Sequence, residues 1–213
     1  MDTMPAELQP LLSDARLKHI PKGQIVVYEG DSAADVYILK TGVIKVHDFD
    51  EQGNEKVLHI MKPPAVMPLV FFQGGSKSKW FYTTLIDSDV YVVSNEEITQ
   101  RMHEDPLLTI YLMHWFARET HELLVRVSSL GKTNTRDKLV AALKFLCVRH
   151  SLERRSGWRR ILFPVSHQLL ADMIGVTRES ATIGMKELQD EGFVRYPRLT
   201  ILEVDFKRLV SET

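Results

Sequence analysis

Residues 164–196 constrain the fold most, because their pattern is that of two short helices joined by a tight turn. They read PVSHQLLADMIGVTRESATIGMKELQDEGFVRY. Apolar residues recur at helical spacing on both sides of Gly175, and a hydroxyl residue, Ser166 or Thr177, precedes each run. Such a side chain suits a helix N-cap, where it accepts hydrogen bonds from free N–H groups. We therefore predict a helix-turn-helix, a motif with which proteins read the major groove of DNA.

The charge of the chain is distributed in a way that fits a nucleic-acid partner for its C-terminal part. Residues 131–213 contain 15 Lys+Arg and 10 Asp+Glu, a net charge of +5, whereas residues 1–130 contain 12 and 18, a net charge of −6. An excess of cations favours contact with a polyanion. Taken alone, the charge leaves open a chance unevenness.

The composition argues against several other classes of protein. The chain has 213 residues, of which 44% are hydrophobic and 26% charged, as is usual for a soluble globular protein. It has no apolar run near the ~20 residues that span a bilayer, and its N-terminus lacks the apolar segment of a signal peptide. We therefore expect a cytoplasmic protein. No nucleophile–base pair, phosphate-binding glycine loop or carboxylate pair stands out, so we do not expect an enzyme.

The chain has a single cysteine, Cys147, which lies in the apolar helical run LVAALKFLC. One cysteine excludes an internal disulfide and a cysteine-ligated zinc or iron–sulfur site within one chain. We predict a buried structural thiol rather than a redox sensor, and we predict no metal site.

Residues 1–105 contain short runs rich in Val, Ile, Tyr and Phe, which predict β-strands. The runs are QIVVYEG, VYILKTG, VIKVHDF, KVLHIM, FYTTLI and VYVVS. Glycine and proline residues separate them, and Gly53 within DEQGNEK suits a hairpin turn. Many short strands at near-regular spacing indicate a sandwich or a barrel-like roll.

Residues 106–130 predict a long helix that is apolar on two sides. Pro106 is tolerated in a first helical turn, and no other Gly or Pro occurs in this segment. One side has a seven-residue repeat formed by Ile110, Ala117 and Leu124, with His114, His121 and Ser128 four residues after each. Another side can cover the roll with Leu108, Leu112, Trp115, Phe116 and Leu123. A helix with two apolar sides needs two partners, so we expect a homodimer.

The segments around the helix-turn-helix complete a C-terminal domain. Residues 135–150 predict an amphipathic helix with Leu139, Leu143 and Leu146 toward the core. Residues 151–160 predict a charged, arginine-rich loop near the DNA backbone, and residues 161–165 a short strand. After the motif, FVRY, PR and LTILEV predict a β-hairpin, or wing, on which Arg195 and Arg198 could meet phosphates.

With these residues and motifs together, the chain resembles the CRP/FNR superfamily of bacterial transcription regulators. The resemblance covers nearly the whole length and depends on PKGQIVVYEGD, VYILKTGVIKV, DEQGNEKVL, the long helix and the TRES motif that opens the second helix of the helix-turn-helix. It implies an α+β fold in three parts. These are a cupin-like, jelly-roll type β-roll of the cyclic-nucleotide-binding kind at 1–105, a dimerisation helix at 106–130, and a winged helix-turn-helix at 131–213.

The resemblance also implies which residues contact DNA. Arg178 and Glu179 match the family's Arg-Glu pair, of which the arginine suits guanine O6 and N7 and the glutamate the cytosine amino group. The alternative for this pair is an exposed ion pair without a role. Ile183 stands where the superfamily commonly has a further arginine, so one contact is lost. The predicted DNA-binding residues are Ser166, His167, Gln168, Thr177, Arg178, Glu179, Thr182 and Lys186.

The sequence departs from the family in the cassette that binds a cyclic nucleotide. Pro68-Leu69-Val70 stands in place of a Gly-Glu-Leu turn, and Lys79-Trp80-Phe81 in place of Arg-Ser/Thr-Ala. Leu69 cannot accept a hydrogen bond from a ribose hydroxyl, and Pro68 lacks an N–H. Lys79 keeps a positive charge without the bidentate fork of arginine. We therefore expect that cyclic AMP is not the effector.

Apolar and aromatic side chains replace the cassette. They form a pocket for an apolar or aromatic effector, or they fill a roll that no longer holds a ligand. The candidate effector-binding residues are Leu69, Lys79, Trp80, Tyr82 and His121. The superfamily also includes haem proteins, but no cysteine lies in the N-terminal module to act as a thiolate ligand. We expect neither haem nor another cofactor.

These observations predict a dimeric regulator that binds double-stranded DNA in a sequence-specific manner, with RNA polymerase as a further partner. Its effector is other than cyclic AMP, or it has none. The alternative is an effector-binding sensor that acts mainly through a protein partner and has weak or lost DNA binding. The match at Arg178 and Glu179 and the positive C-terminal charge favour the first interpretation.

Overall fold

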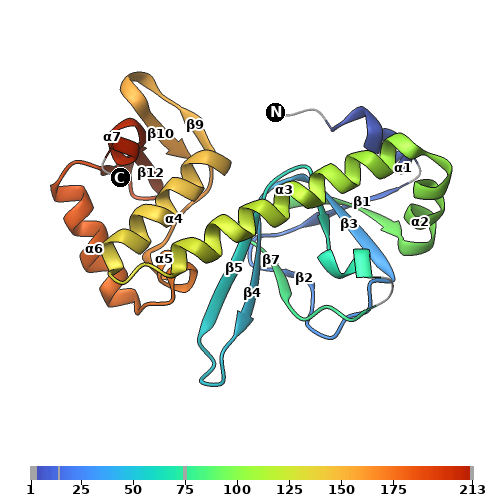
Figure 1. The fold of residues 1–213 in the computed structure, drawn as a ribbon, viewed down its shortest axis with the longest axis horizontal. Coiled ribbons are helices and arrows are strands. Elements are labelled where there is room, and N and C mark those ends of the chain that lie inside the picture. The colour runs from blue at the N-terminus through green and yellow to red at the C-terminus, as the bar shows by residue number, and fades with distance from the viewer. Residues whose placement is uncertain (1–3, 14, 74–75, 212–213) are drawn as a thin grey trace. The chain divides into compact units, whose positions relative to one another are not determined.

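The computed structural model describes residues 4–13, 15–73 and 76–211, without the side chains of 72 and 73 (Figure 1). Two compact units make up the chain. One consists of residues 1–48 and 58–121, and the other of residues 49–57 and 122–213. The long helix α3 (Pro106–Leu130) and the hairpin of β4 and β5 each contribute to both.

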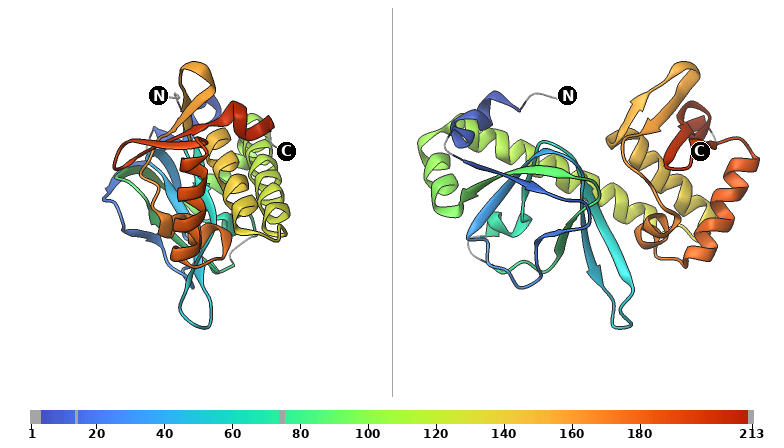
Figure 2. Two further views of the ribbon diagram at one scale, coloured as in Figure 1. Left: turned by 90° about the vertical axis from the view of Figure 1, so that its left-hand side faces the viewer. Right: turned by 180° about the vertical axis from the view of Figure 1, so that it is seen from behind.

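Two four-stranded antiparallel sheets form the predicted β-roll, which Figure 2 shows from behind. The first sheet has the strand order β1-β8-β3-β6 and the second β2-β7-β4-β5. The strands are β1 (Arg16–Ile20), β2 (Ile25–Val27), β3 (Asp35–Thr41), β4 (Ile44–Phe49), β5 (Glu55–Met61), β6 (Ala65–Met67), β7 (Phe81–Thr84) and β8 (Ser88–Ser94).

Two glycines show why the roll closes as the sequence predicts. Gly53 has a φ of +80° in the turn between β4 and β5, a conformation that side-chain-bearing residues rarely adopt. Gly42 has a φ of +105°, and a Cβ atom there would lie 2.0 Å from Ser88 Oγ. The chain can therefore pass closely over β8 only with glycine at position 42.

Several elements of this unit were not predicted from the sequence. They are η1 (Ala6–Leu8), α1 (Gln9–Leu12), β1, β6, η2 (Leu69–Gln73) and α2 (Asn95–Glu104). The helix α2 begins at an N-cap, Ser94, whose side chain accepts a hydrogen bond from Glu97 N–H. Because Ile98 is its single buried residue, this helix has little of the apolar periodicity by which a helix is found.

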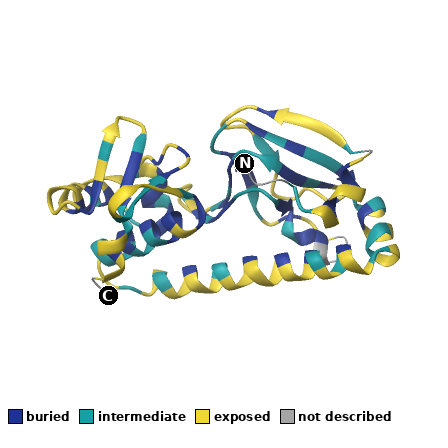
Figure 3. Cartoon of the chain, turned by 90° about the horizontal axis from the view of Figure 1, so that it is seen from above, coloured by how far each residue is buried: buried dark blue, intermediate teal, exposed yellow. Residues whose placement is uncertain are grey.

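The predicted long helix is present as α3, and its two apolar sides have different environments. Its first turn is capped by Asp105, whose Oδ1 accepts hydrogen bonds from two N–H groups of that turn. One side is buried in the roll through Leu108, Leu112 and Trp115. The Trp115 indole N–H also donates to Pro64 O at 3.0 Å. Figure 3 shows this buried side and an exposed opposite side.

The exposed side of α3 carries the seven-residue repeat. All six residues predicted for the seam are exposed, namely Ile110, His114, Ala117, His121, Leu124 and Ser128. Two predictions for the covered side are wrong. Phe116 is 40% exposed instead of buried, because its position on the helix lies outside the buried row. Leu123 is only half-buried and belongs to the second unit, not to the roll.

The second unit is a helical domain with a four-stranded antiparallel sheet of order β11-β12-β10-β9. Its elements after α3 are α4 (Thr135–Arg149), β9 (Ser151–Glu153), η3 (Arg155–Gly157), β10 (Trp158–Ile161), α5 (His167–Ile174), α6 (Arg178–Asp190), β11 (Val194–Arg198), β12 (Ile201–Asp205) and α7 (Phe206–Ser211). The predicted wing is the hairpin of β11 and β12. Leu139, Leu143 and Leu146 of α4 are fully buried, as predicted.

Two predictions for this unit need correction. Residues 151–160 form the hairpin of β9 and β10 and not a loop. The strand expected at 161–165 ends at Ile161, so only its first residue is in β10. The adjacent Arg159 and Arg160 lie on opposite faces of β10, so this strand lacks the apolar–polar alternation by which a strand is found and resembles a polar loop in the sequence. Cys147 is buried as predicted, and burial raises the pKa of its thiol to about 12.

The side chain of Arg126 joins three segments of the second unit. It extends from α3 and is 6% exposed. Its Nη2 donates hydrogen bonds to Val57 O in the β4–β5 hairpin and, at 2.7 Å, to Met173 O in α5. Burial lowers the pKa of this guanidinium to about 10. The first helix of the helix-turn-helix is thus held through a backbone carbonyl.

Candidate nucleic-acid interface

The helices α5 and α6 form the predicted helix-turn-helix with the predicted caps. Ser166 Oγ accepts from Leu169 N–H at 3.0 Å, and Thr177 Oγ1 accepts from Ser180 N–H at 3.2 Å. Gly175 ends α5 with a φ of +67°. The two hydroxyl side chains are exposed, so each caps a helix while one side remains open to solvent.

Small residues let α6 approach its neighbours closely. Ala171 of α5 is fully buried. In α6, a Cβ atom at Gly184 would lie 2.5 Å from Leu139 Cδ1 of α4, closer than packed atoms come. With its inner face seated in this way, α6 presents its opposite face to solvent.

That exposed face contains the predicted base-reading residues. Arg178 and Glu179 form the first turn of α6, and Thr182, Ile183 and Lys186 follow on the next turns. All five are exposed, and Ile183 is 61% exposed although it is apolar. An exposed arginine at the start of such a helix has five N–H donors, of which two can bind guanine O6 and N7 in a bidentate pair.

His167 connects the helix-turn-helix with the wing. Its Nδ1 lies 3.0 Å from Thr182 Oγ1, and its Nε2 lies 3.3 Å from the Tyr196 hydroxyl in β11. The Thr182 hydroxyl donates its one proton to Arg178 O at 2.8 Å, so it accepts from His167 Nδ1–H. Nε2 then accepts from the hydroxyl of Tyr196. Sequence reasoning placed His167 against phosphate and gave Tyr196 no role.

The pKa shifts of His167 and Tyr196 agree with the hydrogen-bond directions assigned to this relay of Thr182, His167 and Tyr196. Burial, and secondarily the positive charge of Arg178, lowers the pKa of His167. Burial raises the pKa of Tyr196 to about 12, so its hydroxyl keeps the proton that it donates. A neutral imidazole therefore orients the second turn of α6 relative to the wing.

Gln168 occupies the exposed start of α5. Its amide Nε2 donates to Asp172 Oδ1 at 2.7 Å, one helical turn farther on. This contact orients the side chain on the same exposed end of α5 as Ser166. Gln168 therefore remains a predicted phosphate contact.

In the roll, the structure brings together two of the five candidate effector residues. Leu69 N–H donates to the hydroxyl of Tyr82 at 3.0 Å. Tyr82 is fully buried, and burial raises its pKa to about 12. At the turn predicted to replace the family's nucleotide cassette, the Leu69 amide therefore bonds to a side chain of the protein itself.

The other three candidates have different environments. Trp80 is partly buried and packs against the core of the roll. Lys79 is exposed, and His121 lies on the exposed side of α3. The side chain of Phe72, which the sequence places among the aromatic residues of this region, lies outside the described residues.

A small hollow of about 200 Å³ beside the cassette turn is acidic. Asp31, Asp35, Tyr37 and Pro68 contribute to its lining. Burial, followed by the negative charges of Asp35 and Asp31, raises the pKa of Tyr37. Two carboxylates at this place would repel an anionic ligand.

Over the part of the chain that the structure describes, no group of three or more His, Cys, Asp or Glu side chains could hold a metal ion. The described helices likewise include none that is both long and apolar enough to cross a membrane.

A β-roll, a long helix and a winged helix-turn-helix, in this order, define a class of DNA-binding transcription regulators. Comparisons with known families agree with this class. The family model of the cyclic nucleotide-binding domain matches residues 17–105, and that of the Crp-like helix-turn-helix domain matches residues 138–210. Together they match most of the chain, and the chain belongs to the CRP/FNR superfamily of transcription regulators. The predicted family and α+β fold are confirmed, and the protein is a regulator rather than an enzyme.

The chain is similar to several characterised regulators. It is 24% identical over 175 residues to the Global nitrogen regulator of Nostoc sp., covering 81% of this chain and 78% of that protein. It is 24% identical over 172 residues to the Nitrogen fixation regulation protein FixK of Rhizobium meliloti, with 81% and 74% covered. The structure of FixK2 from Bradyrhizobium japonicum matches with a TM-score of 0.79 at 18% identity, covering 92% of this chain and 96% of that one.

Proposed function

We propose that this regulator is a homodimer that reads a two-fold symmetric site on double-stranded DNA with its two α6 helices. The observation that carries the proposal is the exposed face of α6, which begins with Arg178 and Glu179. Arg178 contacts a guanine, Glu179 contacts a cytosine amino group, and Thr182 continues the face. Ser166, Gln168 and Thr177 at the helix starts contact phosphates, as does Lys186 farther along α6.

The exposed side of α3 supports the dimer. Ile110 is 44% and Leu124 is 63% exposed, and Ala117 lies between them on the same seven-residue repeat. Apolar side chains at this spacing pack against a second copy of the helix in a two-stranded seam. Two-fold symmetry then places the half-sites about one helical turn of DNA apart. RNA polymerase at the promoter is the further partner, and the cytoplasm is the compartment.

The input of the regulator is something other than cyclic AMP or haem, or it has no small-molecule input. Tyr82 occupies the interior beneath the cassette turn and uses the Leu69 amide. The carboxylates of Asp31 and Asp35 border the hollow beside it. A cyclic phosphate needs cations and free amides at such a turn, so both features support this part of the proposal.

DNA binding is tested with sequences selected from a random pool by the wild-type protein. On a selected site, Arg178→Ala is expected to lose roughly 1–3 kcal/mol of binding free energy and to relax the preference at one base pair. Arg16→Ala, an exposed arginine of β1, is the matched control and should bind normally. An unchanged footprint for Arg178→Ala would show that a different face reads the DNA.

Oligomeric state and effector are tested together by native mass spectrometry of the purified protein. The expected mass is that of two chains without a retained nucleotide or haem. A monomer that selects no DNA sequence would favour the alternative, a sensor that acts through a protein partner.

A further inference from the structure

Ile183 is an exposed apolar side chain on a face of α6 that is otherwise polar. It is 61% exposed, and among residues 178–190, all of which the structure describes, it is the one large apolar side chain at the surface. The helix buries its other apolar side chains, namely Ala181, Met185 and Leu188. Single exposed apolar residues are common on proteins, so exposure alone gives Ile183 no function. What it can do depends on its neighbours.

Packing fixes the direction in which Ile183 points. Gly184, the next residue, lies against α4, where a Cβ atom would be 2.5 Å from Leu139 Cδ1. Because this close contact sets the inner side of α6, residue 183 lies away from the buried row. Helical periodicity places it on the same face as Glu179, one turn earlier, and Lys186, one turn later. An isoleucine in a helix has one strongly preferred χ1 rotamer, so it can be buried by a partner at little cost in entropy.

The neighbouring Thr182 cannot donate a hydrogen bond to a base. Its hydroxyl donates its one proton to Arg178 O at 2.8 Å, one turn earlier in α6. The same oxygen accepts from His167 Nδ1–H at 3.0 Å. No proton is therefore left for guanine O6, adenine N7 or thymine O4. Thr182, an exposed residue, adds a methyl group and no donor to the face that Ile183 shares.

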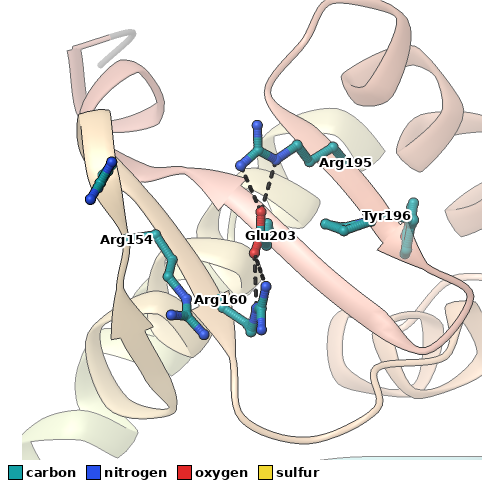
Figure 4. Close-up of a pocket in the computed structure, with 7 residues that line it drawn as sticks. Arg154, Arg160, Arg195, Tyr196 and Glu203 are labelled. Carbon is teal, nitrogen blue, oxygen red and sulfur yellow. Dashed lines mark hydrogen bonds and ion pairs between the residues drawn. The ribbon is translucent and has the colours of Figure 1, made fainter.

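Contacts with the wing hold His167 in the position from which it engages Thr182. The Tyr196 hydroxyl donates to His167 Nε2 at 3.3 Å. Tyr196 lines an open, arginine-lined hollow of about 620 Å³ on the winged sheet, where it lies beside Arg195 (Figure 4). Glu203 Oε2 accepts from Arg195 Nε at 2.8 Å and Nη2 at 2.7 Å, which fixes that guanidinium. The hydroxyl of Thr182 is thus already engaged in the protein alone.

An apolar side chain among polar ones favours thymine over the other bases. In the major groove, guanine and adenine present hydrogen-bonding groups, and cytosine presents an amino group. An isoleucine placed over these groups would remove water from them and give no hydrogen bond in return. Thymine presents a methyl group on the same edge, and its contact with isoleucine buries apolar surface of both partners.

We propose that Ile183 is a specificity-determining residue, which selects a thymine in each half-site by contact with its 5-methyl group. The inference rests on the proposed function, because it concerns a base that α6 reads next to those bound by Arg178 and Glu179. The half-site then has a T·A pair at the position where an arginine at 183 would favour G·C.

The test replaces single thymines by deoxyuridine, which lacks only the methyl group. The wild-type protein first selects its site from a random pool, and its affinity is then measured with each thymine of one half-site replaced in turn. The same series is measured for Ile183→Ala, which changes an exposed side chain and should leave the melting temperature unchanged. Leu17→Ala, which changes an exposed leucine of β1, is the matched control.

At one thymine, the replacement is expected to weaken binding by the wild type about fourfold, the effect of one buried methyl group. For Ile183→Ala the same replacement should change the affinity little, because the contact is already lost. Leu17→Ala should respond as the wild type does, and all three proteins should respond alike at every other thymine. If no thymine responds more strongly in the wild type than in Ile183→Ala, the proposal is wrong.

Ile183→Arg provides an independent measurement. Selection by this variant from the same pool should replace the T·A pair by G·C at that position, since arginine binds guanine O6 and N7. An unchanged selected site would show that residue 183 reaches no base, which overturns the proposal.

Thr182→Val separates the methyl contact from a hydroxyl contact. It removes the hydroxyl and keeps a methyl group, so the difference between thymine and deoxyuridine should persist. Loss of this difference in Thr182→Val but not in Ile183→Ala would assign the thymine to the Thr182 hydroxyl and overturn the proposal. Failure of the proposed function is distinct, because the wild type would then select no site at all.

Discussion

The cassette turn of the roll and the helix-turn-helix contrast in how they use their hydrogen-bonding groups. At the turn, Leu69 N–H is bonded to Tyr82 inside the protein. On α6, Arg178 and Glu179 are exposed with their polar groups open to a partner. The Leu69 amide at the cassette turn is thus satisfied inside the protein, whereas the side chains of α6 that we propose to contact DNA are exposed.

The charges of two hollows follow the same contrast. The hollow beside Pro68 is lined by Asp31 and Asp35, and the hollow on the wing is lined by arginines. An anion is repelled at the first and attracted at the second. In this protein the surface chemistry for binding anions lies in the DNA-binding unit.

The largest expected effect is on stability and comes from Arg126→Met, which changes the DNA-binding unit and leaves the cassette turn of the roll as it is. Arg126→Met removes the donor to Val57 O and Met173 O and leaves two buried carbonyl groups without it. Each such loss costs roughly 1–3 kcal/mol, so the DNA-binding unit should unfold more easily. Urea unfolding, with hydrogen exchange to locate the change, measures this. Arg126→Lys should lose less of the free energy of unfolding. If the α5 amides are equally protected from exchange in the wild type and in Arg126→Met, the role given to Arg126 is wrong.

An intermediate effect tests whether the roll is satisfied internally. Tyr82→Phe keeps the ring but removes the acceptor of Leu69 N–H, which should lower the free energy of unfolding by about 1–3 kcal/mol. Cyclic AMP should still fail to bind, because Asp31 and Asp35 remain. Unfolding in urea and calorimetry measure the two results, with Tyr28→Phe, an exposed tyrosine, as the control. Tight binding of cyclic AMP by Tyr82→Phe would show that Tyr82 alone excludes the nucleotide.

The smallest expected effect depends on pH and concerns the helix-turn-helix alone. The folded state holds the pKa of His167 below the ~6.5 of an unfolded chain, so folding favours the neutral imidazole. The stability that it contributes is complete above about pH 6.5 and is lost as the pH falls through the lower folded pKa. Unfolding at pH 7.5 and 5.5 should therefore show a larger acid loss for the wild type than for His167→Gln. His103→Gln, which changes an exposed histidine of α2, should behave as the wild type. If the wild type and His167→Gln lose equal stability between pH 7.5 and 5.5, the hydrogen bonds of His167 with Thr182 and Tyr196 do not stabilise the fold as predicted.

Local sequence determined much of the architecture. The caps at Ser166 and Thr177, the break at Gly175 and the hairpin at Gly53 could all be predicted, because each depends on residues a few positions apart. The apolar periods of the strands and of α3 gave the fold class for the same reason. Where this local signal is weak, prediction failed, as in the mostly polar α2 and the arginine-rich hairpin of β9 and β10.

Tertiary structure decided the contacts that give these elements their chemistry. Leu69 pairs with Tyr82, His167 with Tyr196, and Glu203 with Arg160 at a separation of 43 residues. Sequence reasoning named Leu69, Tyr82 and His167 as site residues without their partners, and it gave Glu203 no role. Such pairs form only once strand register and helix packing have brought distant residues within about 3 Å. Short-range hydrogen bonding and periodicity can be read along the chain, but the satisfaction of a buried polar group depends on which distant group the fold places beside it.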